Sequence, residues 1–197
     1  MRSLVVILIS SLLTASCSTK IISNNYYQEN KAAVDNIESR YEKLNAAKPF
    51  TVAFTDKKLG IISLEMLSDT LTRIYEFNVG DQRLSDTLSK YNYDTAGINS
   101  LIKKMQQTKV TWINSVDYYV NDQPRQLIYL SIKPITIRYL FSPPKYLALG
   151  YFRTAQSFDE KGRLLDNRRT KRVRKIKNQV FYRITDRICY TITDKYR

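Results

Sequence analysis

The part of the chain beyond residue 109 is dominated by residues that favour extended backbone, and this feature constrains the fold most. β-Branched and aromatic residues fill 110–120, and a second such run covers 126–133 after the turn-forming residues 121–124. Further runs of this kind follow at 135–140, 146–154, 180–184 and 188–192. Because short turns join neighbouring runs, we expect them to pair as an antiparallel meander.

Two helical patterns stand in the first half of the chain. The first begins at Asn24 or Asn25, either of which can cap a helix, and Pro49 ends it. Its apolar residues recur at helical spacing, namely Tyr27, Val34, Ile37, Tyr41 and Leu44. The second follows a cap at Asp94 or Thr95, and its apolar face consists of Ile98, Leu101, Ile102 and Met105. We expect the first stripe to pack on the chain's own sheet, because its heptad pattern is too short for a coiled coil.

Three further runs lie between these helices. Residues 50–54 and 60–64 favour strands, and 70–79 favours a strand by residue type although its apolar residues also fit a helical period. Two helices in the first half and strands along the rest predict an α+β fold. We expect the N-terminal helix and one further helix to pack on a mainly antiparallel β-sheet.

The first sixteen residues have the order of an export signal. Arg2 supplies a positive charge, and an almost wholly apolar run fills residues 4–13. This run is too short to cross a bilayer as a helix, which takes roughly 20 apolar residues. We therefore expect residues 1–16 to be a signal peptide that is removed.

The residues around the expected cleavage point carry a second signal, Leu13-Thr14-Ala15-Ser16-Cys17. This segment resembles the lipobox of bacterial lipoproteins, in which small residues precede a cysteine that is acylated and becomes the mature N-terminus. The family usually has leucine three positions before the cysteine, where this chain has Thr14. The resemblance implies lipidation of Cys17 and attachment to a membrane of the bacterial envelope. Ser18, rather than aspartate, favours the outer membrane over the inner one.

Cleavage ahead of Cys17 sets the expected organisation of the mature chain. Residues 17–23 form a lipidated tether, and 24–197 form a single α+β domain with a basic C-terminal third. Lipidation of Cys17 leaves Cys189 without a disulfide partner, so we expect Cys189 to be buried and apolar in role. The alternative is an ordinary signal peptide cut near Ala15 or Ser16, which leaves Cys17 as a thiol of a soluble secreted protein.

Histidine is absent from the whole chain. Its absence removes the most common general base, the most common metal ligand and every Ser-His or Cys-His nucleophile. One spare thiol cannot supply the ligands of a zinc site. We therefore expect no metal, no cofactor and no histidine-dependent catalysis.

Positive charge is concentrated near the C-terminus. The chain has a net charge of +14, and residues 144–197 hold 15 lysines and arginines against 5 acidic residues. Seven of these cations lie within ten residues that contain no acid: Arg168, Arg169, Lys171, Arg172, Arg174, Lys175 and Lys177. We expect this basic cluster to meet an anionic partner such as anionic lipid, lipopolysaccharide or peptidoglycan.

The basic cluster also has a purely structural interpretation of equal weight. Lysine and arginine on a solvated loop or strand edge prevent edge-to-edge aggregation without binding any ligand. Nucleic acid is the least favoured partner, because the export signal directs the protein away from it.

Two short patterns raise the question of catalysis. Ser100 and Lys103 have the Ser-x-x-Lys spacing of penicillin-binding enzymes, but the accompanying motifs of that family are absent from the chain. Asp159 and Glu160 lie in an expected hairpin turn, where acidic residues are ordinary. We therefore expect a non-enzymatic protein, with a histidine-free hydrolase as the least favoured alternative.

The sequence as a whole predicts a membrane-anchored envelope lipoprotein that binds or supports another component through its basic C-terminal region. The main alternative is a subunit of a larger envelope assembly, with a protein partner. Such a subunit would dock through the stripe of Tyr27, Val34 and Ile37 or through a sheet edge.

Overall fold

The computed structural model describes residues 2–68, 70–137, 145–167 and 169–193, with the backbone alone in 2–19, 133–137 and at 145. The helices within these residues are α1 (Arg2–Ala47), α2 (Gln82–Lys90) and α3 (Thr95–Thr108). The strands are β1 (Phe50–Phe54), β2 (Ile61–Leu67), β3 (Thr72–Asn78), β4 (Val110–Val120), β5 (Gln123–Ile137), β6 (Lys145–Phe152), β7 (Lys175–Ile176), β8 (Gln179–Val180), β9 (Tyr182–Arg183) and β10 (Ile188–Thr193).

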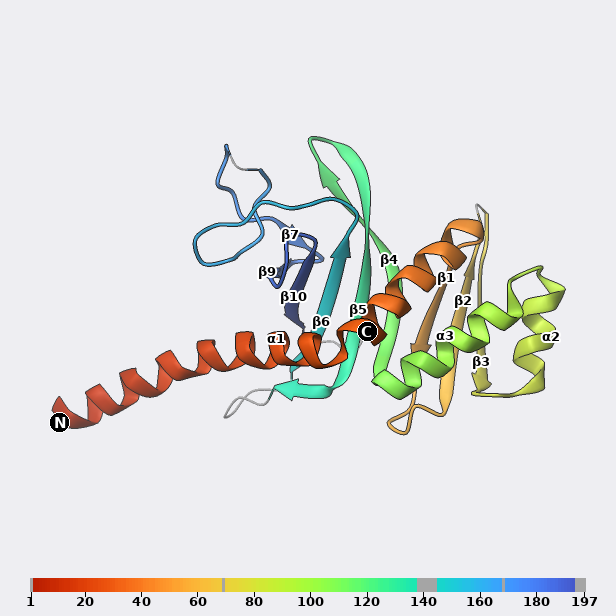
Figure 1. Cartoon of the computed structure of the whole chain (residues 1–197), viewed down its shortest axis with the longest axis horizontal. Helices are drawn as coiled ribbons and strands as arrows, with labels where there is room; N and C mark the ends of the chain where they lie inside the picture. Colours follow the sequence, from red (N-terminus) through yellow and green to blue (C-terminus); the bar gives the residue numbers. More distant parts are fainter. Residues whose placement is uncertain (1, 69, 138–144, 168, 194–197) are drawn as a thin grey trace.

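Eight of the strands form one antiparallel sheet in the order β3-β2-β1-β4-β5-β6-β10-β9, and β7 pairs separately with β8. The consecutive strands β4, β5 and β6 are neighbours, as the predicted meander requires. Figure 1 shows α1 and α3 crossing the same face of this sheet. The α+β class predicted from the sequence is confirmed.

Helix α1 packs on the sheet through the predicted apolar stripe. Tyr27, Val34, Ile37 and Tyr41 are at most 1% exposed, so the stripe is not free to bind a partner. The helix ends at Ala47, two residues before Pro49, but it begins earlier than the predicted cap at Asn24 or Asn25. Residues 20–23, predicted as part of a tether, are helical because no glycine or proline interrupts this region.

The helices beyond β3 agree with the prediction in part. Helix α3 starts after Asp94, whose carboxylate accepts a hydrogen bond from the Gly97 amide, as a helix cap does. Helix α2 was not predicted from the sequence. It has only nine residues, and it is anchored by just two buried side chains, Leu84 and Leu88.

The C-terminal strands differ from the prediction in their ends. The separate strands expected at 126–133 and 135–140 form one strand, β5, which is irregular between Ile132 and Thr136. Pro134 lies in this irregularity, where its missing N–H is tolerated. The strand expected at 180–184 is divided between β8 and β9. Residues 138–140 are outside the described residues.

Over β4, β5, β6 and β10 the sheet is apolar on both faces. The face opposite the helices carries Val116, Tyr118, Leu127, Tyr129, Ala148, Phe152 and Cys189 from β4, β5, β6 and β10. Residues 153–181, which we call the covering segment, fold across these side chains and add Leu164, Ile176 and Phe181 to the same cluster. The region that carries the basic cluster is therefore part of the folded core and not a tail.

Candidate functional site

The proposed lipidation site lies at the start of the chain. Cys17 falls in the part of α1 for which only the backbone is described, so its side chain is outside the described residues. Among the residues whose side chains are placed, no helix is both long and apolar enough to cross a membrane.

The described residues of the basic cluster belong to the covering segment, whose backbone is tied together on either side of them. Leu165 forms a bridge with Val173, and the Asp166 amide donates to the Arg172 carbonyl oxygen at 2.8 Å. Strands β7 and β8 are joined by a tight turn at Lys177 and Asn178, both of which have positive φ angles of 52° and 63°. The exposed cations between these points therefore have defined positions.

Arg174 belongs to the basic cluster, but it is buried. Its guanidinium donates to the Asp166 carbonyl oxygen at 2.7 Å and to the side-chain oxygen of Gln156 at 3.1 Å. It also pairs with the Asp166 carboxylate at 3.4 Å and lies 5.3 Å from the centre of the Tyr118 ring. These contacts give Arg174 an internal role, in which it ties the covering segment to β4.

Lys177 is also engaged within the chain. Its ammonium lies 4.6 Å from the centre of the Trp112 ring and 5.7 Å from that of Tyr129. Partial loss of solvent lowers the pKa of Lys177 below its ordinary value. Lys177 therefore marks the place where the covering segment meets the aromatic side chains of β4 and β5.

Four members of the basic cluster remain available to a partner. Arg169, Lys171, Arg172 and Lys175 are exposed, and their side chains form no ion pair with any described residue. Arg168, the remaining member of the cluster, is outside the described residues. Of the six described members of the basic cluster, Arg174 is buried and Lys177 is exposed but lies over aromatic rings, whereas the other four are exposed without such a contact.

Two adjoining hollows lie between the covering segment and the hairpin of β4 and β5. One has a volume of about 280 Å³ and the other about 420 Å³, and both are bordered by Tyr119, Asp166 and Arg174. Arg172 lines the first, whereas Lys175 and Lys177 line the second. Of the four available cations, Arg172 and Lys175 therefore border a concave surface.

The hairpin residues in these hollows were not predicted as part of a site. Tyr119 is 66% exposed, and Asp117 and Asp122 are also exposed. The turn residues Asn121 and Asp122 indicate the tip of a hairpin in the sequence. Nothing in the local sequence indicates that the covering segment returns to it.

A third hollow lies on the opposite face, between α1 and the sheet. It has a volume of about 220 Å³, and Glu38, Glu42, Tyr41 and Tyr151 contribute to its lining. Burial is the main cause that raises the pKa of Glu38 above its ordinary value, and Arg153 pairs with Glu42 at 3.1 Å. This polar hollow was also not predicted, because it depends on where α1 crosses β4, β5 and β6.

The candidate catalytic residues do not form a reactive arrangement. Ser100 accepts a hydrogen bond from Arg40 at 2.9 Å, and Lys103 is exposed. Asp159 closes the predicted turn by accepting hydrogen bonds from the amides of Lys161 and Arg163, and Gly162 has a positive φ angle of 74°. Cys189 is buried as expected, and burial raises its pKa well above the ordinary value, which disfavours the reactive thiolate.

Metal-binding chemistry has no support within the part of the chain that the structure describes. No group of three or more aspartate, glutamate or cysteine side chains there is placed to hold an ion. No protein-family model, curated protein or solved structure matches the chain.

Proposed function

We propose that this protein is a bacterial envelope lipoprotein, acylated at Cys17, whose basic surface binds an anionic component of the envelope. The basic surface consists of Arg169, Lys171, Arg172 and Lys175 on the covering segment. Two or more acyl chains give stable attachment to a membrane, whereas one chain holds only marginally. The protein acts by binding and has no catalytic role in this proposal.

One observation supports the binding role most directly. Arg174 is neutralised by Asp166 within the fold, while four neighbouring cations stay exposed without an acidic partner among the described residues. Like charges held close together repel one another, so their fixed proximity costs stability that an anionic ligand offsets. This arrangement favours a ligand with several negative charges.

The binding role is tested by removing the four exposed cations together. We expect the variant with Arg169, Lys171, Arg172 and Lys175 all replaced by glutamine to bind phosphatidylglycerol vesicles at least a hundredfold more weakly. The reason is that each cation near an anionic surface contributes about 1 kcal/mol at physiological salt. Cosedimentation measures this binding, and all proteins in the assay begin at Ser18 so that neither acyl chains nor the apolar run of residues 4–13 dominates it.

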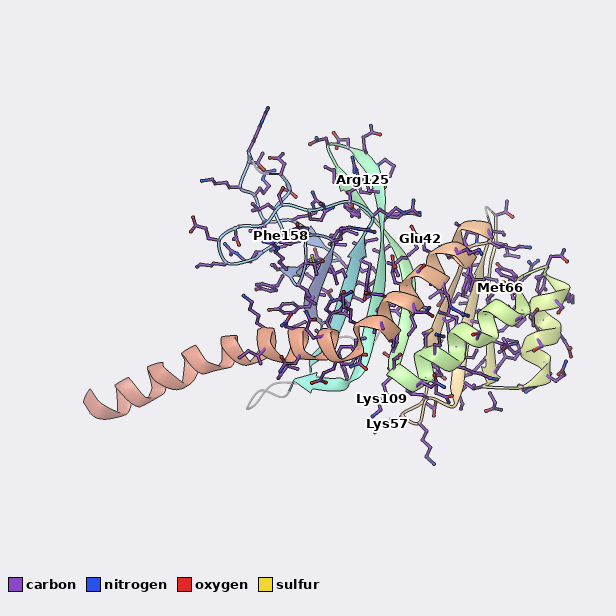
Figure 2. The ribbon with its side chains drawn as sticks, in the orientation of Figure 1. Glu42, Lys57, Met66, Lys109, Arg125 and Phe158 are labelled. Carbon is purple, nitrogen blue, oxygen red and sulfur yellow. The ribbon has the colours of Figure 1, made fainter. Side chains whose placement is uncertain are left out.

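A matched control separates position from total charge. Lys57, Lys58, Lys103 and Lys109 are exposed lysines elsewhere on the domain, and their replacement by glutamine removes the same charge. Figure 2 shows Lys57 and Lys109 at the end of the sheet opposite Arg125 of the hairpin. Equal loss of binding in both quadruple variants would contradict a specific basic surface, because net charge alone would then explain the attraction.

The anchor is tested separately, in cells. We expect the wild-type chain to incorporate an alkyne-labelled fatty acid and to stay with membranes through a high-salt wash. Detergent should release it, because acyl chains and not ion pairs hold it. Cys17→Ser should abolish the label, whereas Cys189→Ser should retain it. A label that persists in Cys17→Ser, or release of the wild type by salt alone, would overturn the lipoprotein assignment.

A further inference from the structure

The hairpin of β4 and β5 extends beyond the rest of the sheet. Strand β1 pairs with β4 only through Val52 with Ile113 and Ala53 with Trp112, but β4 continues as far as Val120. Figure 1 shows this hairpin rising past the end of β1. The upper part of β4 is therefore a sheet edge, although β4 lies in the middle of the strand order.

The outward-facing backbone groups of this edge follow from the hairpin turn. Val120 and Gln123 flank a two-residue turn whose residues Asn121 and Asp122 have φ angles of 49° and 60°. In such a hairpin the flanking pair is hydrogen bonded, so the even-numbered residues of β4 bond to β5 and the odd-numbered residues face outward. The Ser115 amide, which faces outward, donates to the Tyr41 hydroxyl at 3.1 Å.

The next two outward-facing residues are Asp117 and Tyr119. No described residue contributes a hydrogen bond to their outward N–H and C=O groups. The two residues together present four backbone groups with the spacing of an unpaired strand. Such an edge is a template for an added strand.

The two edges of the same hairpin are protected differently. On the β5 side, Pro124 stands opposite Tyr119 in the register, and proline cannot donate a ladder hydrogen bond. The upper part of β4 has no proline between Val110 and Val120. One edge is thus closed to strand addition, and the other is open.

The open edge borders the basic surface. The hollow of about 420 Å³ is lined by Asp117 and Tyr119 on one side and by Lys175 and Lys177 of the covering segment on the other. Tyr119 is 66% exposed. The residues of the open edge and two cations of the covering segment therefore border one concave strip.

We propose that the open edge of β4 binds an extended, acidic segment of a partner protein as an additional antiparallel or parallel strand. This inference deepens the proposed function, on which it rests for the role of the cations. A strand repeats its outward hydrogen-bonding groups roughly every 7 Å, which matches the spacing along β4 and not a lipid headgroup. A second copy of this chain is disfavoured as the occupant, because the chain is strongly basic, with a net charge of +14 over the full sequence.

Asp117 provides a variant that blocks the edge with little effect on the hairpin. Its N–H faces outward, so Asp117→Pro removes a group that β5 does not use. Asp117→Asn is the matched control, because it removes the same negative charge and keeps the N–H. The probe is a capped seven-residue peptide that alternates glutamate and valine, and the same peptide with lysine for glutamate is the charge control.

We expect Asp117→Pro to weaken binding of the acidic peptide by about tenfold or more, since a lost hydrogen bond and the proline ring both oppose pairing. Asp117→Asn should bind as well as the wild type or better, because a like charge has been removed. The lysine peptide should not bind. Equal affinity of Asp117→Pro and Asp117→Asn in calorimetry would overturn strand addition.

Amide hydrogen exchange in the wild-type chain gives a test that needs no folded variant. Addition of the acidic peptide should protect the amides of Asp117 and Tyr119, while phosphatidylglycerol vesicles should not. The amide of Tyr118 is already bonded to β5 and should change little. No protection at Asp117 and Tyr119 by a saturating peptide would refute the inference. The proposed function would survive that result if vesicle binding still depended on the four exposed cations.

Discussion

The face of the sheet opposite the helices consists of two unlike halves. On β4, β5, β6 and β10 it carries large apolar side chains, and the covering segment buries them. On β1 and β2 the same face carries small or polar side chains, namely Thr51, Ala53, Ser63 and Glu65. Ile74 of β3 lies on this second half and is 65% exposed. One half therefore carries large apolar side chains under the covering segment, and the other carries small or polar side chains beside the exposed Ile74.

This contrast explains how the four exposed cations are positioned. Cations on a free tail would occupy many positions, and ordering them at a ligand would cost conformational entropy. Here Leu164, Ile176 and Phe181 hold the covering segment to the sheet, and Arg174 adds a charged contact beside them. The apolar half of the face thus positions the exposed cations before any ligand arrives.

The largest expected effect comes from removing the centre of the covered half. Phe181 is fully buried and packs edge-on against Tyr129 and Phe152, with ring centres 6.4 and 6.2 Å apart. We expect Phe181→Ala to lower the free energy of unfolding by about 3–5 kcal/mol, because the change leaves a cavity among aromatic rings. Denaturant unfolding followed by circular dichroism measures this loss.

The matched change on the other half is Ile74→Ala. Its side chain is mostly in solvent, so we expect a change within about 0.5 kcal/mol in the same assay. Similar losses for the two variants would mean that the two halves do not differ in the way described. Phe181→Ala should also weaken vesicle binding if a loosened covering segment no longer holds its cations in place.

The elements predicted correctly are those whose residue pattern is local. Strands β1 and β4 have the predicted bounds, since their β-branched and aromatic residues are bounded by turn-forming residues. Helix α2 was missed because two leucines in nine residues give too little periodicity. The early start of α1 was missed because absence of a helix breaker is a weaker signal than a cap.

The candidate site was predicted only in outline. The sequence identifies seven cations but cannot distinguish Arg174 from Arg172, because burial of Arg174 depends on Tyr118, which is distant in the chain. The open edge of β4 was equally hidden, since it exists only because β1 pairs with so short a part of β4. Features set by contacts between distant segments do not appear in local sequence patterns.

A modest effect is expected at the boundary between the two halves, at Lys177. A cation over aromatic rings contributes roughly 0.5–1 kcal/mol at an exposed site, so we expect Lys177→Met to change stability at neutral pH by no more than this. The pH dependence is more informative. Because the folded-state pKa of Lys177 is lowered, the unfolded chain binds more protons at this site as pH approaches the ordinary lysine value.

The wild type should therefore gain stability relative to Lys177→Met as pH rises toward the ordinary pKa of lysine. At lower pH the difference between the two free energies of unfolding should stay constant. Denaturant unfolding of both proteins between neutral and mildly alkaline pH measures it, and the subtraction removes the contribution of the buried tyrosines that both share. If the free energy of unfolding of the wild type instead falls relative to that of Lys177→Met as pH rises, attraction to Trp112 and Tyr129 outweighs the loss of solvent. The ammonium would then be a contact that favours the charged form, and the edge of the covering segment would be held by charge and not only by apolar packing.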